Sequence, residues 1–83
     1  MSNRNITNMK SYEVILKFYN ACGGTAHAQT TFDEADLLDP ADYIRRKHQK
    51  DFDRFRKEQL PNGNLLYTFD NGSVAYCYEF TEI

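Results

Sequence analysis

The first part of the chain alternates between apolar and polar side chains. The apolar positions are Tyr12, Val14, Leu16 and Phe18. A period of two is typical of a β-strand that buries one face. The pattern predicts a strand that begins near Ser11, after a polar, Asn-rich lead-in over residues 1–10.

A Gly-Gly pair at 23–24 interrupts this pattern and predicts a turn. Residues 26–34 can then return as a second strand, whose weak propensity suits a sheet edge. A three-residue loop at 22–24 sets Val14 opposite Phe32, whereas a two-residue loop sets Val14 opposite Asp33. We predict the first register, with Phe18 opposite Ala28, because it keeps Phe32 on the apolar face.

A helix is predicted from Pro40 to about Gln59. Asp39 suits the N-cap, Pro40 the first helical position and Asp42 the capping box. The Leu60-Pro61-Asn62-Gly63 turn then ends the helix. Its expected apolar stripe consists of Ala41, Ile44, His48, Phe52 and Phe55. Its basic side chains are expected on the opposite face, in i,i+4 pairs Asp42–Arg46, Lys47–Asp51 and Asp53–Lys57.

The C-terminal segment predicts a hairpin around Asn71-Gly72, a pair typical of a two-residue type I′ turn. With that loop, the facing pairs are Phe69–Val74, Tyr67–Tyr76 and Leu65–Tyr78. All six side chains then share one face of the sheet.

These elements predict an α+β fold of β-β-α-β-β order, formed by a single domain over residues 11–83. One amphipathic helix packs on one face of a four-stranded antiparallel sheet. No second helix is left to cover the other face. That face is expected to carry Ile15, Lys17, Tyr19, Leu66, Thr68, Ala75, Cys77, Glu79 and Thr81.

Composition limits the function classes. The chain has 83 residues, 41% hydrophobic and 27% charged, as expected for one small globular domain. The net charge of −2 argues against a dedicated nucleic-acid-binding protein, although residues 45–57 carry +5 and the remainder −7. The sequence shows no signal-peptide pattern and no apolar stretch of membrane-spanning length. We therefore expect a cytoplasmic protein with reduced thiols, although a Cys22–Cys77 disulfide stays open.

The sequence offers few residues for catalysis. Cys22, Cys77, His27 and His48 lack the short spacings typical of zinc sites, and His48 falls on the predicted buried stripe. The Gly-Gly pair is not followed by the Lys-Ser/Thr of a phosphate-binding loop. We expect no enzyme, no metal and no cofactor.

The tail contains the sequence Cys77-Tyr78-Glu79-Phe80-Thr81-Glu82-Ile83, preceded by Ser73-Val74. It resembles the C-terminus of a small phage-borne anti-CRISPR family that inhibits type II-C Cas9. That family ends in Cys-aromatic-Glu-Phe-x-Glu-aliphatic, and its cysteine region blocks the HNH nuclease domain. Cys77 matches the contact position, whereas Tyr76 replaces a serine of the family. The resemblance implies a non-enzymatic inhibitor encoded by a phage or mobile element.

We therefore expect an interaction protein that binds and occludes a host nuclease or other defence protein. Its partner-binding residues are predicted to be Ile15, Tyr19, Leu66, Cys77, Glu79 and Glu82. One alternative is a nucleic-acid-binding accessory protein that uses Arg45, Arg46, Lys50, Arg54 and Lys57. Another alternative is a structural homodimer whose sheet faces pack together.

Overall fold

A computed structural model describes residues 9–20 and 27–83. Most of the predicted lead-in and the predicted loop at 22–24 lie outside the described residues. The elements in chain order are β1 (Lys10–Asn20), β2 (His27–Leu37), α1 (Pro40–Lys47), the 3-10 helix η3 (Phe52–Arg54), β3 (Arg56–Gln59), β4 (Leu65–Asp70) and β5 (Val74–Glu82).

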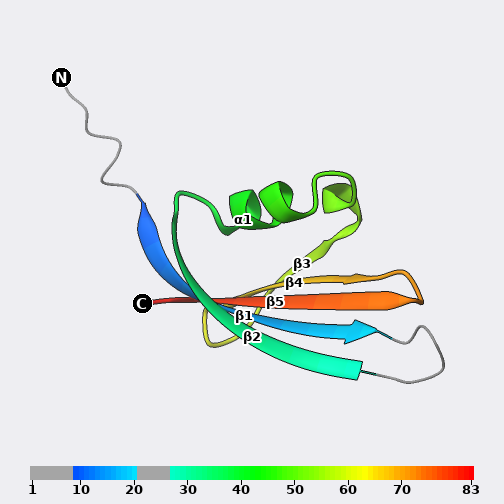
Figure 1. The fold of residues 1–83 in the computed structure, drawn as a ribbon. Helices are drawn as coiled ribbons and strands as arrows, with labels where there is room; N and C mark the ends of the chain where they lie inside the picture. Colours follow the sequence, from blue (N-terminus) through cyan, green and yellow to red (C-terminus); the bar gives the residue numbers. More distant parts are fainter. Residues whose placement is uncertain (1–8, 21–26) are drawn as a thin grey trace.

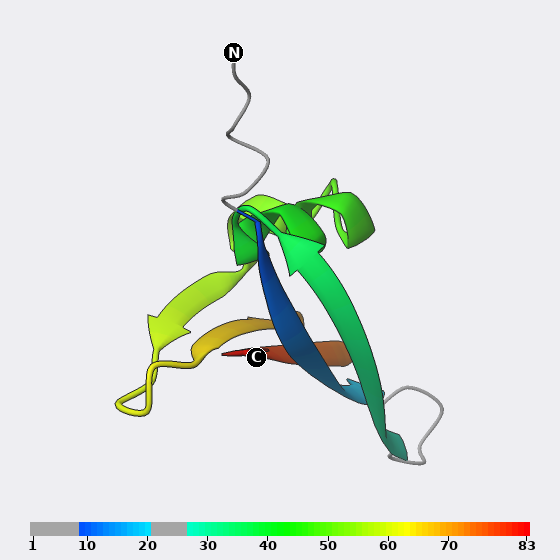
Figure 2. The same ribbon diagram turned by 90° about the vertical axis from the view of Figure 1, so that its left-hand side faces the viewer.

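The strands form one antiparallel sheet in the order β2-β1-β5-β4-β3. Figure 1 shows α1 and the following turn on one side of this sheet. In the view of Figure 2 the sheet curls, so that β3 on one side and β1 and β2 on the other rise toward the helix. The α+β class with an antiparallel sheet and one α-helix is confirmed, but the described residues form five strands instead of four.

The helix starts where the sequence predicts and ends much earlier. The Asp39 side chain accepts a hydrogen bond from the Ala41 amide at 3.0 Å, and Pro40 is the first helical residue. The helix ends at Lys47 and not near Gln59, with His48 as its C-cap.

The sheet explains the early end of the helix. Arg56–Gln59 form β3, which pairs with Thr68–Leu65 of β4. A helix continuing to Gln59 would leave the outer edge of β4 without backbone partners. Phe52 and Phe55 still pack against the core, as Ala41 does. The apolar spacing therefore predicts which side chains face the core, although the backbone is not a continuous helix and only Ile44 of the stripe is fully buried.

The first hairpin differs from the prediction by one residue. Val14 faces Asp33, and Phe32 faces Ile15. A slip of one residue moves every side chain of a strand to the other face, so Phe32 points away from the helix and is 68% exposed. Two side chains of β2 that face the helix favour this register. Leu37 is 2% exposed, and Asp33 accepts a 2.8 Å hydrogen bond from the Tyr43 hydroxyl.

The second hairpin slips by two residues relative to the prediction. The facing pairs are Phe69–Tyr76, Tyr67–Tyr78 and Leu65–Phe80. The connection is longer than two residues because side chains bind its backbone. Asn71 Oδ1 accepts hydrogen bonds from the amides of Ser73 and Val74, and Gly72 has φ +91°. An even slip leaves each side chain on its predicted face.

The core lies between α1 and the centre of the sheet. Its most buried side chains are Val14, Leu37, Ile44, Tyr67, Tyr78 and Phe80. Tyr67 and Tyr78 face each other across β4 and β5, and both are at most 3% exposed. Their hydroxyl groups differ. That of Tyr78 lies 2.7 Å from His48 Nε2, whereas that of Tyr67 is buried without a hydrogen-bond partner in the described structure.

This difference predicts opposite effects for two matched substitutions. Tyr67→Phe removes an unsatisfied buried hydroxyl and is expected to leave the free energy of unfolding unchanged or to raise it by up to ~1 kcal/mol. Tyr78→Phe removes a hydrogen bond and is expected to lower the free energy of unfolding by ~1 kcal/mol. Urea denaturation of both variants measures the two values, and equal losses would contradict this account of the core.

His48 is partly buried and hydrogen-bonded to Tyr78 on the helix side of the sheet, where its place on the apolar stripe predicts it. Its ring lies 4.5 Å from that of Tyr76 and 5.0 Å from that of Phe55, centroid to centroid. Burial lowers the pKa of His48 below 6.5, and the nearby Asp51 charge opposes this shift. Burial also raises the pKa of Tyr78 to about 12. Both groups are therefore neutral at physiological pH.

A lowered histidine pKa makes the fold acid-sensitive. The stabilisation from neutral His48 is complete above the unfolded pKa of 6.5 and is lost as pH falls through the folded pKa. As the pH falls from 6.5 through the folded pKa of His48, we expect the melting temperature to drop, at pH values above those at which the carboxylates titrate. His48→Gln should flatten the drop when both proteins carry His27→Gln. An unchanged slope would contradict the assignment to His48.

Candidate functional site

The face of the sheet opposite α1 is covered by no other described element. Strand pairing places odd-numbered residues of β1 and β5, and even-numbered residues of β2, β3 and β4, on this outer face. All nine side chains that the sequence assigns to the uncovered face lie there. The register also aligns them into rows that cross the strands.

The central row is apolar with acidic members. It runs Phe32, Ile15, Glu79, Leu66 and Glu58 across the five strands. Phe32 is the most exposed of the three apolar side chains, whereas Ile15 and Leu66 are half-buried. The Asn64 side-chain amide donates a 2.8 Å hydrogen bond to Glu79 Oε2, which orients that carboxylate.

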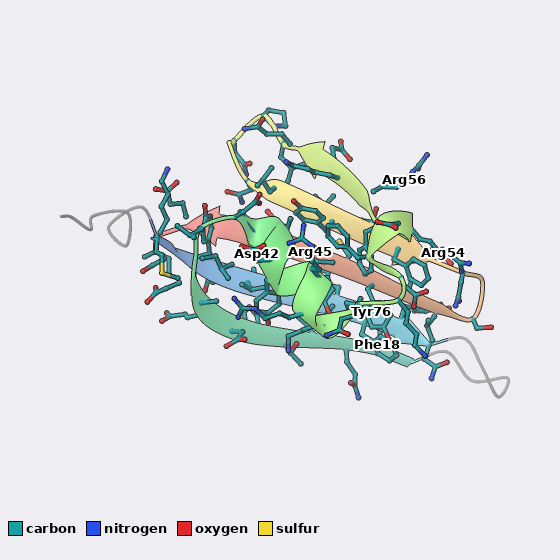
Figure 3. All side chains as sticks on the ribbon, turned by 90° about the horizontal axis from the view of Figure 1, so that it is seen from above. Phe18, Asp42, Arg45, Arg54, Arg56 and Tyr76 are labelled. Atoms are coloured by element: carbon teal, nitrogen blue, oxygen red, sulfur yellow. The ribbon has the colours of Figure 1, made fainter. Side chains whose placement is uncertain are left out.

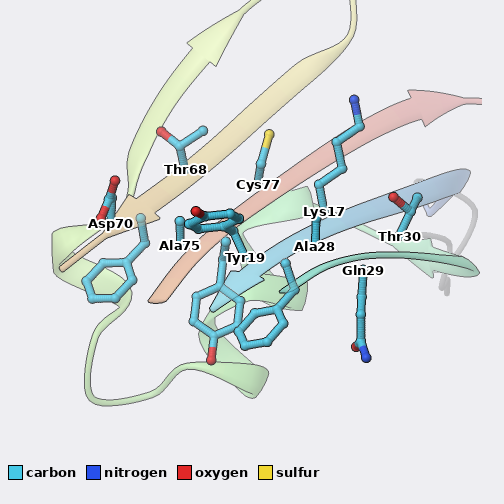
Figure 4. Close-up of a pocket in the computed structure, with 12 residues that line it drawn as sticks. Lys17, Tyr19, Ala28, Gln29, Thr30, Thr68, Asp70, Ala75 and Cys77 are labelled. Atoms are coloured by element: carbon cyan, nitrogen blue, oxygen red, sulfur yellow. The ribbon is translucent and has the colours of Figure 1, made fainter. Parts of the chain in front are cut away.

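Beside this row lies a shallow hollow of about 390 Å³. The next row carries Lys17 beside Cys77, and the last row carries Tyr19 between Ala28 and Ala75. Because both alanines are small, the ring of Tyr19 can lie along the sheet surface, as Figure 4 shows. The hollow has an apolar floor with polar groups at its border.

The opposite end of the outer face is acidic. Glu13 and Glu34 face each other on β1 and β2, and Asp36 follows, accepting a 2.6 Å hydrogen bond from the Ser11 hydroxyl. Like charges in facing positions cost stability. The carboxylates of the outer face are Glu13, Glu34, Asp36, Glu58, Asp70 and Glu79, and its cations are Lys17 and Arg56. The face therefore carries a net charge of −4.

Cys77 lies at the middle of the outer face and is partly buried. Burial raises the pKa of the Cys77 thiol, and the Glu79 carboxylate adds to the shift, while Lys17 opposes it. The thiol is therefore protonated at neutral pH and is a weak nucleophile. This environment suits a contact residue better than a reactive one.

Five of the six predicted partner-binding residues share this face, and Glu82 does not. Glu82 is even-numbered, like the residues of β5 that face the helix, and its carboxylate lies 3.7 Å from Lys10 Nζ. The sequence interpretation missed Phe32, which it placed inside. The alternation in residues 28–36 allows either the even-numbered or the odd-numbered side chains to face the core. Only the pairing with β1 decides between these two possibilities.

The basic residues do not form one helical face, because the helix ends at Lys47. Arg45 and Arg46 lie on α1, Lys50 follows it, Arg54 ends η3, and Lys57 lies on β3. Figure 3 shows Arg45 apart from Arg54 and Arg56. Arg45 Nη1 contacts Asp42 Oδ1 at 2.6 Å, replacing the predicted Asp42–Arg46 pair, and the guanidinium lies 4.6 Å from the ring centre of Phe52.

Among the described residues, no group of three or more His, Cys, Asp or Glu side chains is arranged to hold a metal ion. In the same part of the chain, no helix has the length and apolar character needed to cross a membrane. No family model, curated protein or solved structure matches the chain.

The pKa of Cys77 gives a direct prediction. In a Cys22→Ser background, alkylation of Cys77 by iodoacetamide at neutral pH should be slower than that of a solvent-exposed thiol. The pH at which the alkylation rate reaches half its maximum should lie above 9.0. Lys17→Ala should raise this pH further, because the ammonium group favours the thiolate. Alkylation as fast as that of a free thiol would contradict the protected environment.

Proposed function

We propose that this protein is a small non-enzymatic interaction protein that binds a partner protein with its outer sheet face and occludes a functional surface of that partner. The observation that carries the proposal is the central row of that face. Phe32, Ile15 and Leu66 are aligned on an open sheet, beside a hollow that contains Cys77. A row of apolar side chains without cover is typical of an interface.

The charge of the same face favours a basic partner surface. Its net charge of −4 comes from two carboxylates within the apolar row and three on one side of it, whereas the side with the hollow carries Lys17, Arg56 and Asp70. A nucleic-acid-handling protein presents such a surface, because its groove neutralises phosphates. Charge complementarity would speed the encounter and fix the orientation, while the apolar row would supply the buried centre.

The tail resemblance nominates the class of partner. Cys77 and Glu79, two residues that carry the resemblance, project from β5 on the outer face. Tyr78 and Phe80, which lie between and after them, are buried in the core. This division supports an inhibitor of the anti-CRISPR kind, in which the tail is both a structural strand and part of the contact surface. A host nuclease such as Cas9 is the target that we propose.

A decisive test places one charge in the apolar row. Leu66→Asp should weaken binding to purified type II-C Cas9 by roughly a hundredfold or more, because an unpaired carboxylate would lie in the desolvated centre of the interface. The same variant should relieve inhibition of target-DNA cleavage. Titration calorimetry and a cleavage assay measure the two effects.

The matched control is Leu38→Asp. Leu38 lies between β2 and α1, outside the rows of the outer face, and is 61% exposed, so the same substitution there leaves those rows unchanged. Leu38→Asp should bind like the unmodified chain. Equal binding by folded Leu66→Asp would contradict the outer face as the binding site, and full cleavage with the unmodified chain would contradict Cas9 as the target.

The nucleic-acid-binding alternative makes a different prediction for the same samples. Binding through Arg45, Arg46, Lys50, Arg54 and Lys57 would persist in Leu66→Asp and would fall steeply with salt. DNA titration at two salt concentrations therefore separates the two functions.

A further inference from the structure

β2 forms one edge of the sheet and is unusually long for an edge strand. It spans eleven residues, His27–Leu37, and among the described residues it pairs only with β1. Its other edge presents backbone donors and acceptors that can pair with another strand. Figure 2 shows β2 along the outside of the curled sheet. At its centre stands Phe32, with 68% of its surface exposed.

We propose that β2 pairs in antiparallel fashion with β2 of a second copy of this chain, in a register centred on Phe32. A two-fold axis perpendicular to the sheet then passes between the two Phe32 residues. This arrangement keeps the outer faces of both copies on the same side, because facing residues of antiparallel strands share a face. It also pairs the full length of β2, from His27 opposite Leu37 to Leu37 opposite His27.

The distribution of charge along β2 selects this register. In the Phe32-centred pairing, every carboxylate faces an uncharged residue of the other copy: Asp33 faces Thr31, Glu34 faces Thr30 and Asp36 faces Ala28. No like charges stand in facing positions, which would be destabilising. The two exposed aromatic rings meet at the axis, where they can cover each other.

Other symmetric registers are less favourable. Centring the pair on Asp33 or Glu34 places two identical carboxylates in facing positions. Centring it on Ala35 sets Glu34 opposite Asp36. Centring the pair on a residue that precedes Phe32 shortens the part of β2 that is paired and separates the two Phe32 rings. The Phe32-centred register is thus the longest pairing of β2 with itself that avoids facing carboxylates.

This dimer differs from a packing of two sheet faces. It joins two five-stranded sheets edge to edge into one continuous sheet. Ile15, Leu66 and Cys77 of both copies stay uncovered on the same side. The self-association therefore does not depend on the proposed function, and it would give a partner two equivalent surfaces.

Disulfide trapping tests the register directly, in a background of Cys22→Ser and Cys77→Ser. Across the axis, the Cα atoms of residue 32 would lie roughly 4.5–5.5 Å apart, within disulfide range. Those of residue 30 would lie about 14 Å apart, beyond it. With copper phenanthroline as oxidant, Phe32→Cys should form a covalent dimer and Thr30→Cys should not. Preferential trapping by Thr30→Cys, or by neither variant, would overturn the proposal.

Sedimentation equilibrium tests the energetics with a matched charge pair. Thr30→Lys places a cation opposite Glu34 of the other copy and should tighten self-association by roughly threefold to tenfold, and Thr30→Glu should weaken it similarly. Within one copy, Thr30 faces Lys17, so the effects on monomer stability have the opposite sign. Phe32→Lys should weaken the dimer at least about tenfold, whereas Tyr19→Lys on β1 should not. A monomer at all concentrations, or a dimer insensitive to residues 30 and 32, would overturn the proposal.

Discussion

The structure depends on β5, the central strand of the sheet. It pairs with β1 on one side and β4 on the other, and its even-numbered side chains form the floor of the core. Tyr78 and Phe80 are almost completely buried there. The rings of Tyr43, Tyr67 and Tyr12 pack edge-on against Phe80. Since strand side chains alternate, burying these residues fixes Cys77 and Glu79 on the outer face.

A second constraint is the small size of the helical layer. Eight residues of α1 span only ~12 Å. With η3, they cover the middle of one sheet face, and no described element covers the other. A small chain that folds as one sheet and one short helix therefore leaves an apolar row in contact with solvent. The proposed function uses this row, and the proposed dimer uses the edge strand at its end, where Phe32 belongs to both surfaces.

The two register differences have different consequences for the site. The second hairpin slips by two residues, so Leu66, Cys77 and Glu79 keep the face that alternation predicts. The first hairpin slips by one residue, so Phe32 moves from the predicted core to the centre of the exposed row. Local turn chemistry could not decide this, because the contacts that favour it join Leu37 and Asp33 to residues beyond the hairpin.

The sequence by itself determined the class of fold, the capped start of α1, and the alternation that divides β1, β4 and β5 into buried and open faces. These properties depend on near neighbours in the chain, whose spacing is visible in the sequence. Tertiary structure decided the end of α1, the existence of β3 and the register of β2. Each of these depends on distant partners: β4 supplies hydrogen bonds to β3, and the core accepts Leu37 in place of Phe32. Pairing energies between distant segments override local propensity, so the exposure of Phe32 follows only from the assembled sheet.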